Sequence, residues 1–438
     1  MGSNSFHEAS AQGRLDVMGG IADYSGSLVM QMPISEKTSV RLKLRQDFVC
    51  TFESITESGE RLLATIDYRK FLKDEKVDYA FAHEELKRNA GNEWIGYVIG
   101  CALVLQKERQ IDFKGGDFFI ESNVPLGKGV SSSASLEVAT MKAVANAFNI
   151  TFTGTELPLL AQRTENFIVG APCGLMDQLT SYFGEPRKFL SIVCQPDRVE
   201  KAIPIPDHIF FLGIDSGIRH SVGGASYADV RCATFMGYTI IAQALGASRN
   251  DIRKAIEHKD FSDLPGKGYL CNVALKEFKT NLSMLLPDRM LGEEFLLTYG
   301  NSIDTATTID STKQYDIKTC AAHPIYENER VHHFRQLLID INQSGKMSHE
   351  GLLVKMGELM YEAHESYTCC GLGSDRTDDI VRLARGLGSS VYGAKITGGG
   401  SGGTVCILAE GEEGRKSVHN LHQELCNKYS SRLRLFQS

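Results

Sequence analysis

Apolar and polar residues alternate along the first part of the chain in a way that predicts strands. Two segments are rich in β-branched or alternating apolar residues: SLVMQMPI (27–34) and SVRLKLRQDFVCTFES (39–54). The second segment carries its charges on one face, as expected for a half-buried strand. A short strand is also expected in GGDFFIESNV (115–124). The first third of the chain is therefore predicted to be rich in strands.

Longer segments with helical spacing follow. The pattern predicts three helices in the first half: NEWIGYVIGCALVLQKE (92–108), SSSASLEVATMKAVANAFN (131–149) with a serine cap, and TELPLLAQRTENFIVG (155–170), stopped by Gly170 and Pro172. The second half alternates strands with long helices. The strands are expected at 210–216, 390–397 and 404–410, and the helices around 225–247, 322–342, 347–367 and 414–428.

Charges and prolines interrupt this pattern in QPDRVEKAIPIPDHI (195–209), where we place a domain boundary. A chain of 438 residues is also too long for one compact core. We expect an α+β (mixed α/β) protein of two domains, 1–200 and 201–438.

Composition narrows the classes of partner. The chain has 47 Lys and Arg against 54 Asp and Glu, a net charge of −7, which disfavours sequence-independent binding of nucleic acid. No apolar run approaches the roughly 18 residues of a membrane span. The 11 cysteines show no CxxC spacing, so we expect free, mostly buried thiols in a reducing cytosol. Small phosphorylated ligands remain compatible, because loops and helix N-termini bind them without net positive charge.

The strongest local signal is VPLGKGVSSSAS (124–135). Here a strand ends, Gly127 and Gly129 loosen the backbone, and Ser131, Ser132 and Ser133 open a helix. Backbone N–H groups at a helix N-terminus bind phosphate, and hydroxyls add donors or a Mg²⁺ ligand. The segment is not a P-loop, because GxxxxGK[ST] occurs nowhere in the chain. An ordinary serine-capped helix after a glycine turn explains the same pattern equally well.

A second glycine cluster lies in KITGGGSGGTVCIL (395–408). Gly398, Gly400 and Gly403 satisfy GxGxxG, but a strand follows them where a dinucleotide site needs a helix. We reject a dinucleotide site and expect a hairpin tip. Its backbone either fits closely against a ligand or is simply flexible.

Three charged residues are candidates for chemistry. Glu165 lies near the C-terminal end of its helix, where the helix dipole disfavours a negative charge. Asp177 follows in the loop GAPCGLMDQ, which contains few polar residues. A buried carboxylate there needs a charged or hydrogen-bonding partner. Arg14 could be that partner. Taken singly, each carboxylate is more commonly a surface charge.

Several motifs occur together in one order: GRLDVMGGIADYSG, a Trp-bearing helix, PLGKGVSSSAS, ENFIVGAPCGLMDQ, DSGIRHSVGGASY and TGGGSGG. From Gly13 to about Ile407 the chain resembles the GHMP small-molecule kinases, and among them the galactokinases. The resemblance implies a two-domain fold with the active site between the N-terminal and C-terminal domains. It also implies ATP and Mg²⁺ as cofactors and a small sugar as substrate.

The resemblance implies a role for each matched residue. Asp177 would be the base that accepts the proton of the anomeric hydroxyl, and Arg14 would stabilise the resulting anion. Ser133 and Glu165 would hold Mg²⁺. The sugar would contact Asp23, Tyr227 and the small or apolar residues Gly20, Ile21 and Gly174. The ATP phosphates would be wrapped by the loop that includes Gly127, Gly129, Ser131, Ser132 and Ser133. Trp94 and Tyr97 would line the adenine pocket, unless they are simply core residues of their helix.

One departure from the galactokinase pattern concerns substrate. Galactokinases read GEHTDY, with Glu and His near the exocyclic C6 group of the sugar, whereas this chain reads GGIADY, with Gly20 and Ile21 there. A site built for a hydroxyl rejects a sugar without it, and an Ile in that volume suits such a sugar. The motif closely resembles that of the plant L-arabinokinases. The resemblance thus implies formation of L-arabinose 1-phosphate, and that the chain corresponds to the kinase portion of those proteins.

Three alternatives stay open at this point. The chain could be a galactokinase or a uronic-acid 1-kinase of the same family, although no cation stands between Gly19 and Tyr24 to meet a uronate. It could be a sugar sensor without catalytic activity. It could also be a kinase of the mevalonate or homoserine type. The motifs containing Asp177 and Tyr227 fit the galactokinase branch better than the last of these.

Overall fold

The computed structural model describes residues 5–56, 59–88, 91, 93–171, 173–195, 197–218, 225–344 and 349–438. The chain forms two compact units. The first comprises residues 1–14 and 32–186 together with Ser438, and the second comprises residues 15–31 and 187–437. Strands β1 (His7–Met18) and β2 (Leu28–Leu44) therefore each contribute to both units.

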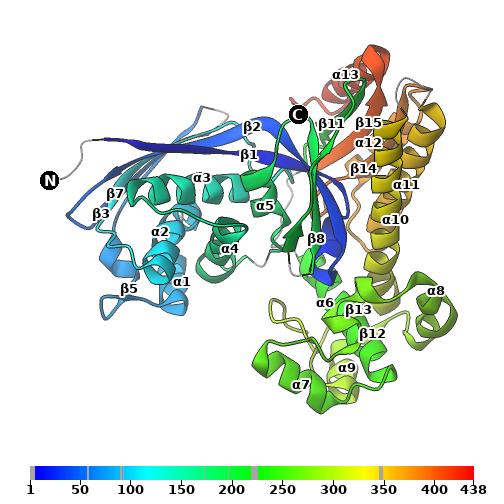
Figure 1. Cartoon of the computed structure of the whole chain (residues 1–438), viewed down its shortest axis with the longest axis horizontal. Coiled ribbons are helices and arrows are strands. Elements are labelled where there is room, and N and C mark those ends of the chain that lie inside the picture. The colour runs from blue at the N-terminus through cyan, green and yellow to red at the C-terminus, as the bar shows by residue number, and fades with distance from the viewer. Residues whose placement is uncertain are drawn as a thin grey trace. The chain divides into compact units, whose positions relative to one another are not determined.

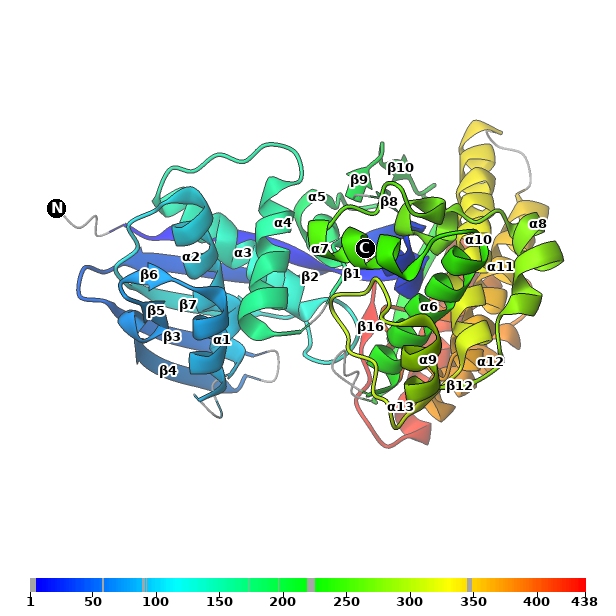
Figure 2. The ribbon, with the colours of Figure 1, turned by 90° about the horizontal axis from the view of Figure 1, so that it is seen from below.

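The first unit is a sheet covered by helices. Residues 38–44 of β2 pair antiparallel with β7 (Gly116–Ser122), β7 pairs parallel with β3 (Val49–Ile55), and β3 pairs antiparallel with β4 (Arg61–Asp67). Figures 1 and 2 show the helices on one face of this sheet. They are α1 (Tyr79–Lys87), α2 (Gly96–Arg109), α3 (Ser132–Ala147) and α4 (Glu156–Arg163), followed along the chain by α5 (Met176–Phe183).

Among its described residues, the second unit contains part of the eight-stranded sheet, a four-stranded sheet and a two-stranded sheet of β12 (Met290–Leu291) and β13 (Gln314–Tyr315). Residues 28–31 of β2 pair with β8 (Lys188–Cys194), which also pairs with β9 (Asp197–Val199) and β10 (Ile203–Pro204). The four-stranded sheet has the antiparallel order β14-β15-β11-β16. Its strands are β14 (Val391–Ile396), β15 (Thr404–Glu410), β11 (Ile209–Asp215) and β16 (Leu435–Phe436).

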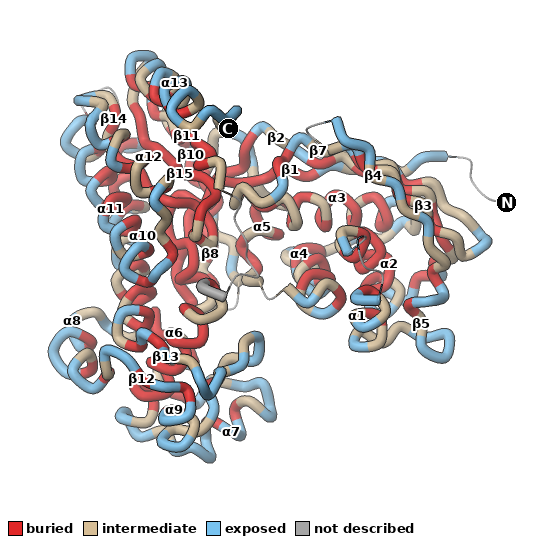
Figure 3. Tube along the Cα trace, turned by 180° about the vertical axis from the view of Figure 1, so that it is seen from behind, coloured by how far each residue is buried: buried red, intermediate tan, exposed pale blue. Residues whose placement is uncertain are grey.

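Helices surround the four-stranded sheet and extend beyond it. Helix α11 packs against α10 and β14, α12 packs against β14, α13 packs against β15, and α10 packs against α6. The buried residues of this unit follow the strands and the inner sides of these helices (Figure 3). The helices are α6 (Ala225–Ala244), α7 (Arg249–His258), α8 (Leu275–Glu277), α9 (Gly292–Tyr299), α10 (Ile317–Gln343), α11 (Glu350–Cys369), α12 (Asp375–Arg385) and α13 (Gly411–Lys428).

The mixed α/β class predicted from the sequence is confirmed, and most predicted elements are present. Three differ in detail. The predicted strands 27–34 and 39–54 are β2, which runs unbroken to Leu44, and then β3. The helix predicted over 155–170 is α4 followed by a π-helical segment, Thr164–Val169. Helix α12 was not predicted, although Ser374 forms a capping box with Thr377 at its start.

The division into units is not a single cut in the sequence. Residues 15–31 belong with the chain after residue 187, so the contacts divide the chain differently from a boundary near 195–208. The assignment of 1–200 and 201–438 as domains stays a prediction. Among the described residues, no helix is both long and apolar enough to cross a membrane.

Candidate active site

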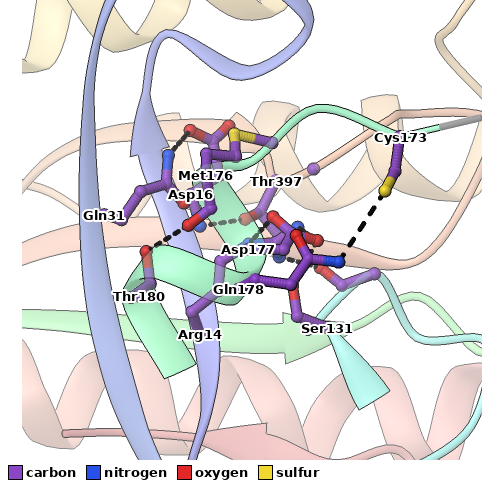
Figure 4. Close-up of polar contacts among 12 residues, drawn as sticks. Arg14, Asp16, Gln31, Ser131, Cys173, Met176, Asp177, Gln178, Thr180 and Thr397 are labelled. Atoms are coloured by element: carbon purple, nitrogen blue, oxygen red, sulfur yellow. Dashed lines mark hydrogen bonds and ion pairs between the residues drawn. The ribbon is translucent and has the colours of Figure 1, made fainter. Parts of the chain in front are cut away.

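The first unit brings Arg14 and Asp177 together. Arg14 lies within β1 and is 3% exposed, and Asp177 is the second residue of α5. The guanidinium donates two parallel hydrogen bonds to the carboxylate, Nε to Oδ1 at 2.9 Å and Nη2 to Oδ2 at 2.8 Å (Figure 4). Paired bonds of this kind fix the orientation of a carboxylate. The sequence predicted Asp177 in a loop, but the residue lies in the first turn of α5. The helix dipole favours a negative charge at this position.

The loop before α3 completes this arrangement. The Ser131 hydroxyl donates to Asp177 Oδ2 at 2.6 Å, and Arg14 donates to the carbonyl oxygen of Gly129 at 2.6 Å. Ser131 has a left-handed φ of 61°, and its side chain accepts no capping hydrogen bond from α3. The serine cap expected here is absent, because the hydroxyl is directed to Asp177. The first N–H groups of α3 thus keep their capacity to bind an anion.

The arrangement has a definite chemical capacity. The Asp177 side chain is 24% exposed, while that of Arg14 is 4% exposed. A carboxylate held by a buried cation and still open on one side can accept a proton from a bound hydroxyl. The cation beside it stabilises the negative charge that develops on the oxygen. Gly174, another predicted site residue, is partly buried and lies two residues before α5.

A second carboxylate cluster surrounds Glu165. This residue lies in the π-helical segment, is 6% exposed, and shares a hydrogen bond with Ser133. Gln178 Nε2 donates to Oε2 of Glu165 at 2.8 Å and to Oε2 of Glu137 at 3.1 Å, and Cys173 Sγ lies 3.3 Å from Glu165 (Figure 4 labels Cys173 and Gln178). Burial raises the pKa of Glu165 to about 7, and burial together with Glu165 raises that of Glu137.

This cluster fits a hard cation. Ser133 and Glu165 supply a hydroxyl and a carboxylate oxygen, which suits Mg²⁺, an ion that binds few protein groups and keeps several waters. The negative charge of Asp177 adds to the cost of charging Glu165. A divalent cation would relieve that cost. The donor set that the resemblance implied is thus compatible with the metal, and its occupancy stays a prediction.

A pocket of about 220 Å³ lies beside the same loop. Trp94, in the short 3₁₀ segment Glu93–Ile95, lines it, and Ser132 connects it to the start of α3. Trp94 also packs edge to face on Phe52, with ring centroids 6.1 Å apart. An aromatic side chain at the edge of a partly apolar pocket is suited to a flat heterocycle. The pocket is lined by Thr38, Ser54, Thr56, Glu60, Leu62, Trp94, Ile120, Ser122, Val124, Leu126, Ser132 and Leu136.

Tyr97 is placed differently from Trp94. It is absent from the lining of this pocket. It is mostly buried, and its pKa is raised by burial and by Glu165 and Glu137. Tyr97 therefore faces the carboxylate cluster, whereas Trp94 lines the pocket; that this pocket holds adenine stays a prediction.

In the second unit, Asp23 lies in the 3₁₀ segment Gly20–Ser25 and is 5% exposed. Tyr227, at the start of α6, is 8% exposed, and its ring meets that of Tyr24 edge to face at 6.3 Å. Arg231 follows one turn later on α6 and interacts electrostatically with both Asp23 and Tyr227. It is held by a bidentate pair with Asp304, at 3.0 and 2.9 Å. Sequence reasoning missed Arg231, although it lies four residues after Tyr227 and so on the same helix face.

A buried ion pair supports the turn that carries Asp23. Asp16 and Lys395 are both fully buried, and Lys395 Nζ donates to Asp16 Oδ2 at 3.0 Å. Asp16 Oδ1 accepts from Gln31 Nε2 at 2.7 Å and from the Gly20 N–H at 3.0 Å, and its own N–H donates to Thr397 at 2.7 Å (Figure 4 labels Asp16, Gln31 and Thr397). A buried charge pair with this many hydrogen bonds fixes the backbone around it.

Gly20 and Ile21 adopt positions that the sequence did not reveal. Ile21 is 2% exposed and packs in the apolar core of this unit together with Tyr227 and Tyr367. Gly20 has a φ of +44°, and a Cβ atom on it would lie 1.5 Å from the Tyr367 hydroxyl. Tyr367 thus fills the space beside residue 20. That Ile21 fills the volume of a missing hydroxymethyl group stays a prediction.

The second glycine cluster forms the predicted hairpin tip. It connects β14 to β15, and the Thr397 N–H donates to the Thr404 carbonyl at 2.9 Å. Gly398, Gly400 and Gly403 all have positive φ, between 69° and 80°. The strand after them confirms that this is no dinucleotide loop. The stretch between Ile218 and Ala225, which contains part of the DSGIRHSVGGASY motif, lies outside the described residues.

Comparison with protein families matches both halves of the chain. The description "GHMP kinases N terminal domain" fits residues 96–185, and "GHMP kinases C terminal" fits residues 348–430. The first range holds Asp177, Glu165 and the loop before α3. The second holds the glycine hairpin. The chain thus contains segments similar to both GHMP kinase domains.

Among curated proteins, the chain is similar to sugar kinases. It is 39% identical to an L-arabinokinase of Arabidopsis thaliana, in an alignment that covers 95% of this chain and 43% of that relative. The chain thus spans less than half of the length of that protein. It is 29% identical to a galactokinase of Chloroflexus aggregans, over 92% of this chain and 84% of the relative.

Solved structures show the same fold. The Lactococcus lactis galactokinase complexed with galactose matches with a TM-score of 0.70 at 20% identity, covering 99% of this chain and 93% of the other. The L. major mevalonate kinase in complex with R-mevalonate matches with a TM-score of 0.55 at 15% identity, covering 100% and 98%.

Proposed function

We propose that the chain is an ATP- and Mg²⁺-dependent sugar 1-kinase that converts L-arabinose to L-arabinose 1-phosphate. The observation that supports phosphoryl transfer most directly is Asp177, held by Arg14 and Ser131 and open on one side. Phosphoryl transfer needs mainly positioning and charge stabilisation, and a single carboxylate, a cation and a donor-rich loop supply them.

The reaction divides among residues as follows. The anomeric oxygen of the sugar attacks the γ-phosphorus of ATP while Asp177 accepts the hydroxyl proton. The bond from that phosphorus to the bridging oxygen of the β-phosphate breaks, and ADP leaves. Arg14 stabilises the charge on the sugar oxygen, and the N–H groups before and at the start of α3 hold the phosphates. Bound Mg²⁺, held by Ser133 and Glu165, would supply neutralisation of phosphate charge.

The sugar is assigned to residues of the second unit. Asp23 accepts hydrogen bonds from ring hydroxyls, and Tyr227 contacts the sugar face. Gly20 and Ile21 offer no polar side chain to an exocyclic hydroxymethyl group, which favours L-arabinose over D-galactose. The 39% identity to an L-arabinokinase supports the same choice.

A matched pair of assays tests the proposal. ATP consumption is measured with L-arabinose and with D-galactose under identical conditions, and kcat/KM is compared. A clear preference for L-arabinose is expected. Equal or better use of D-galactose would retain the kinase and reject the substrate. Turnover of neither sugar would favour a sensor or another acceptor.

D-galactose is the second candidate substrate. Relatives described as galactokinases align over more than four-fifths of their own length, as the Chloroflexus aggregans protein does at 84%. The residues proposed to perform the phosphoryl transfer are the same for both sugars, so only the turn that carries Asp23 distinguishes the two candidates.

A further inference from the structure

The position beside Gly20 is closed by a residue that comes from far along the chain. A Cβ atom on Gly20 would lie 1.5 Å from the hydroxyl oxygen of Tyr367 and 2.7 Å from the ring carbon that carries it. Cβ atoms in proteins essentially never lie within 3.0 Å of a heavy atom outside their own residue and its two chain neighbours. No side chain can therefore stand at residue 20 while Tyr367 keeps its place.

Tyr367 is firmly held in that place. It lies near the end of α11 and is fully buried. Its ring meets His323 edge to face, with centroids 5.2 Å apart, and Lys395 Nζ lies 5.3 Å from its centroid. A buried ring with neighbours on its edge and face cannot rotate aside without opening a cavity.

The Tyr367 hydroxyl also joins two loops. It accepts a hydrogen bond from the Ile21 N–H at 2.9 Å and donates one to the Gly398 carbonyl at 3.0 Å. Ile21 lies two residues before Asp23, and Gly398 begins the glycine hairpin. The single O–H donor is used for the backbone, so it is not available to a ligand.

We infer that Tyr367 is the positioning residue that sets sugar selectivity in this chain. It excludes any side chain at Gly20, leaves the turn before Asp23 without a polar group, and ties that turn to the glycine hairpin through Ile21 and Gly398. A sugar without an exocyclic polar group then leaves nothing unpaired. This role rests on the proposed function, whereas the exclusion at residue 20 does not.

The exclusion is tested first, without substrate, by thermal unfolding of a double-mutant cycle. Gly20→Ala is compared in the native chain and in Tyr367→Leu, which retains apolar volume but lacks the clashing atoms. We expect Gly20→Ala to lower Tm much less in the Tyr367→Leu background, where the positive φ and the Asp16 Oδ2 atom at 3.0 Å still disfavour it. The matched control is Tyr361→Leu, another buried tyrosine of α11 outside this contact. An equal loss of Tm in all three backgrounds would overturn the inference.

Selectivity is tested next by kcat/KM for L-arabinose and D-galactose. The double variant Gly20→Glu with Tyr367→Leu is expected to lower the ratio of L-arabinose to D-galactose at least about tenfold, mainly through KM for the sugars, with KM for ATP unchanged. Tyr367→Phe keeps the ring and should keep the ratio, with a higher KM for both sugars. An unchanged ratio in the double variant would refute the selectivity role.

Failure of the proposed function and failure of the inference about Tyr367 give different experimental results. If the native chain shows no preference for L-arabinose, the proposed function fails and the selectivity role fails with it. The Tm cycle still decides whether Tyr367 holds residue 20 empty. If the native chain prefers L-arabinose and the cycle shows no coupling, the proposed function stands and Tyr367 is not the cause.

Discussion

Replacing Asp177 with Asn removes a proton acceptor while preserving nearly all of the side-chain volume. Three donors point at the carboxylate: Arg14 Nε, Arg14 Nη2 and the Ser131 hydroxyl. Asn keeps one oxygen for them and turns an NH₂ group toward at least one. It also leaves the buried Arg14 without a full counter-charge. The substitution thus affects both folding and chemistry, and the two magnitudes decide whether they can be separated.

We expect Asp177→Asn to affect folding stability less than it affects kcat. Removing one partner of a fully buried ion pair costs about 3–5 kcal/mol. Because the Asp177 side chain is 24% exposed and Asn retains one acceptor, we expect a loss of about 1–3 kcal/mol. A domain with about 5–15 kcal/mol of stability remains folded after such a loss. Loss of a general base lowers kcat by about 10²–10⁴.

The assay follows ADP formation at saturating ATP and sugar, with thermal unfolding measured on the same samples. Ser131→Ala is the matched control, since it removes one hydrogen bond to Asp177 but leaves the carboxylate. We expect it to lower kcat by at most about tenfold. A folded Asp177→Asn variant whose kcat lies within about threefold of the native value would refute the role of Asp177 as base.

Three further outcomes are expected. Trp94 is the only tryptophan in the chain and lines the proposed adenine pocket, so ATP or ADP should change the intrinsic fluorescence; an unchanged spectrum at saturating nucleotide would place the adenine elsewhere. Glu165→Gln should raise the Mg²⁺ concentration for half-maximal activity about 10–100-fold, with binding of metal-free ADP retained; an unchanged Mg²⁺ dependence would remove Glu165 from the metal site. Burial lowers the pKa of His323 from 6.5 to about 4, so the unfolded chain takes up a proton at a pH where the folded chain does not. Stability should therefore fall by about 3 kcal/mol as pH drops from 6.5 to 4, and His323→Gln should flatten this slope in urea unfolding. If the stability of His323→Gln falls equally steeply with pH, other titratable groups cause the loss.

The sequence predicts best what short segments decide by themselves. The loop before α3 and the hairpin at Gly398 were both recognisable, because glycine, serine and apolar periodicity act over a few residues. The Ser131 hydroxyl is different. Its partner Asp177 is 46 residues away, so a helix cap and a contact with a distant carboxylate look identical along the chain.

The long strand β2 shows a second limit. The sequence predicted two separate strands, 27–34 and 39–54, whereas β2 runs from Leu28 to Leu44. In the structure β2 pairs with β8 over residues 28–31 and with β7 over residues 38–44. Pro33 lies between these two pairings, so its missing N–H group removes no hydrogen bond from either of them. Local patterns could not show that one strand changes partners.

Tyr367 shows the same limit over a long sequence separation. Its bond to the Ile21 N–H spans 346 residues of sequence, and nothing in the segment around Tyr367 distinguishes it from an ordinary core tyrosine. The missing side chain at Gly20 was visible in the sequence. The group that takes its place was not.

The buried pair of Asp16 and Lys395 has a consequence for how the chain is made. The two residues are 379 positions apart, and each is fully buried. At a synthesis rate of about 5–20 residues per second, Asp16 emerges roughly 20–80 s before its partner exists. Until then a segment destined for the interior of the second unit carries an unpaired charge. Residues 15–31 must therefore stay solvated on the ribosome, and the second unit can close only after Lys395 has been synthesised.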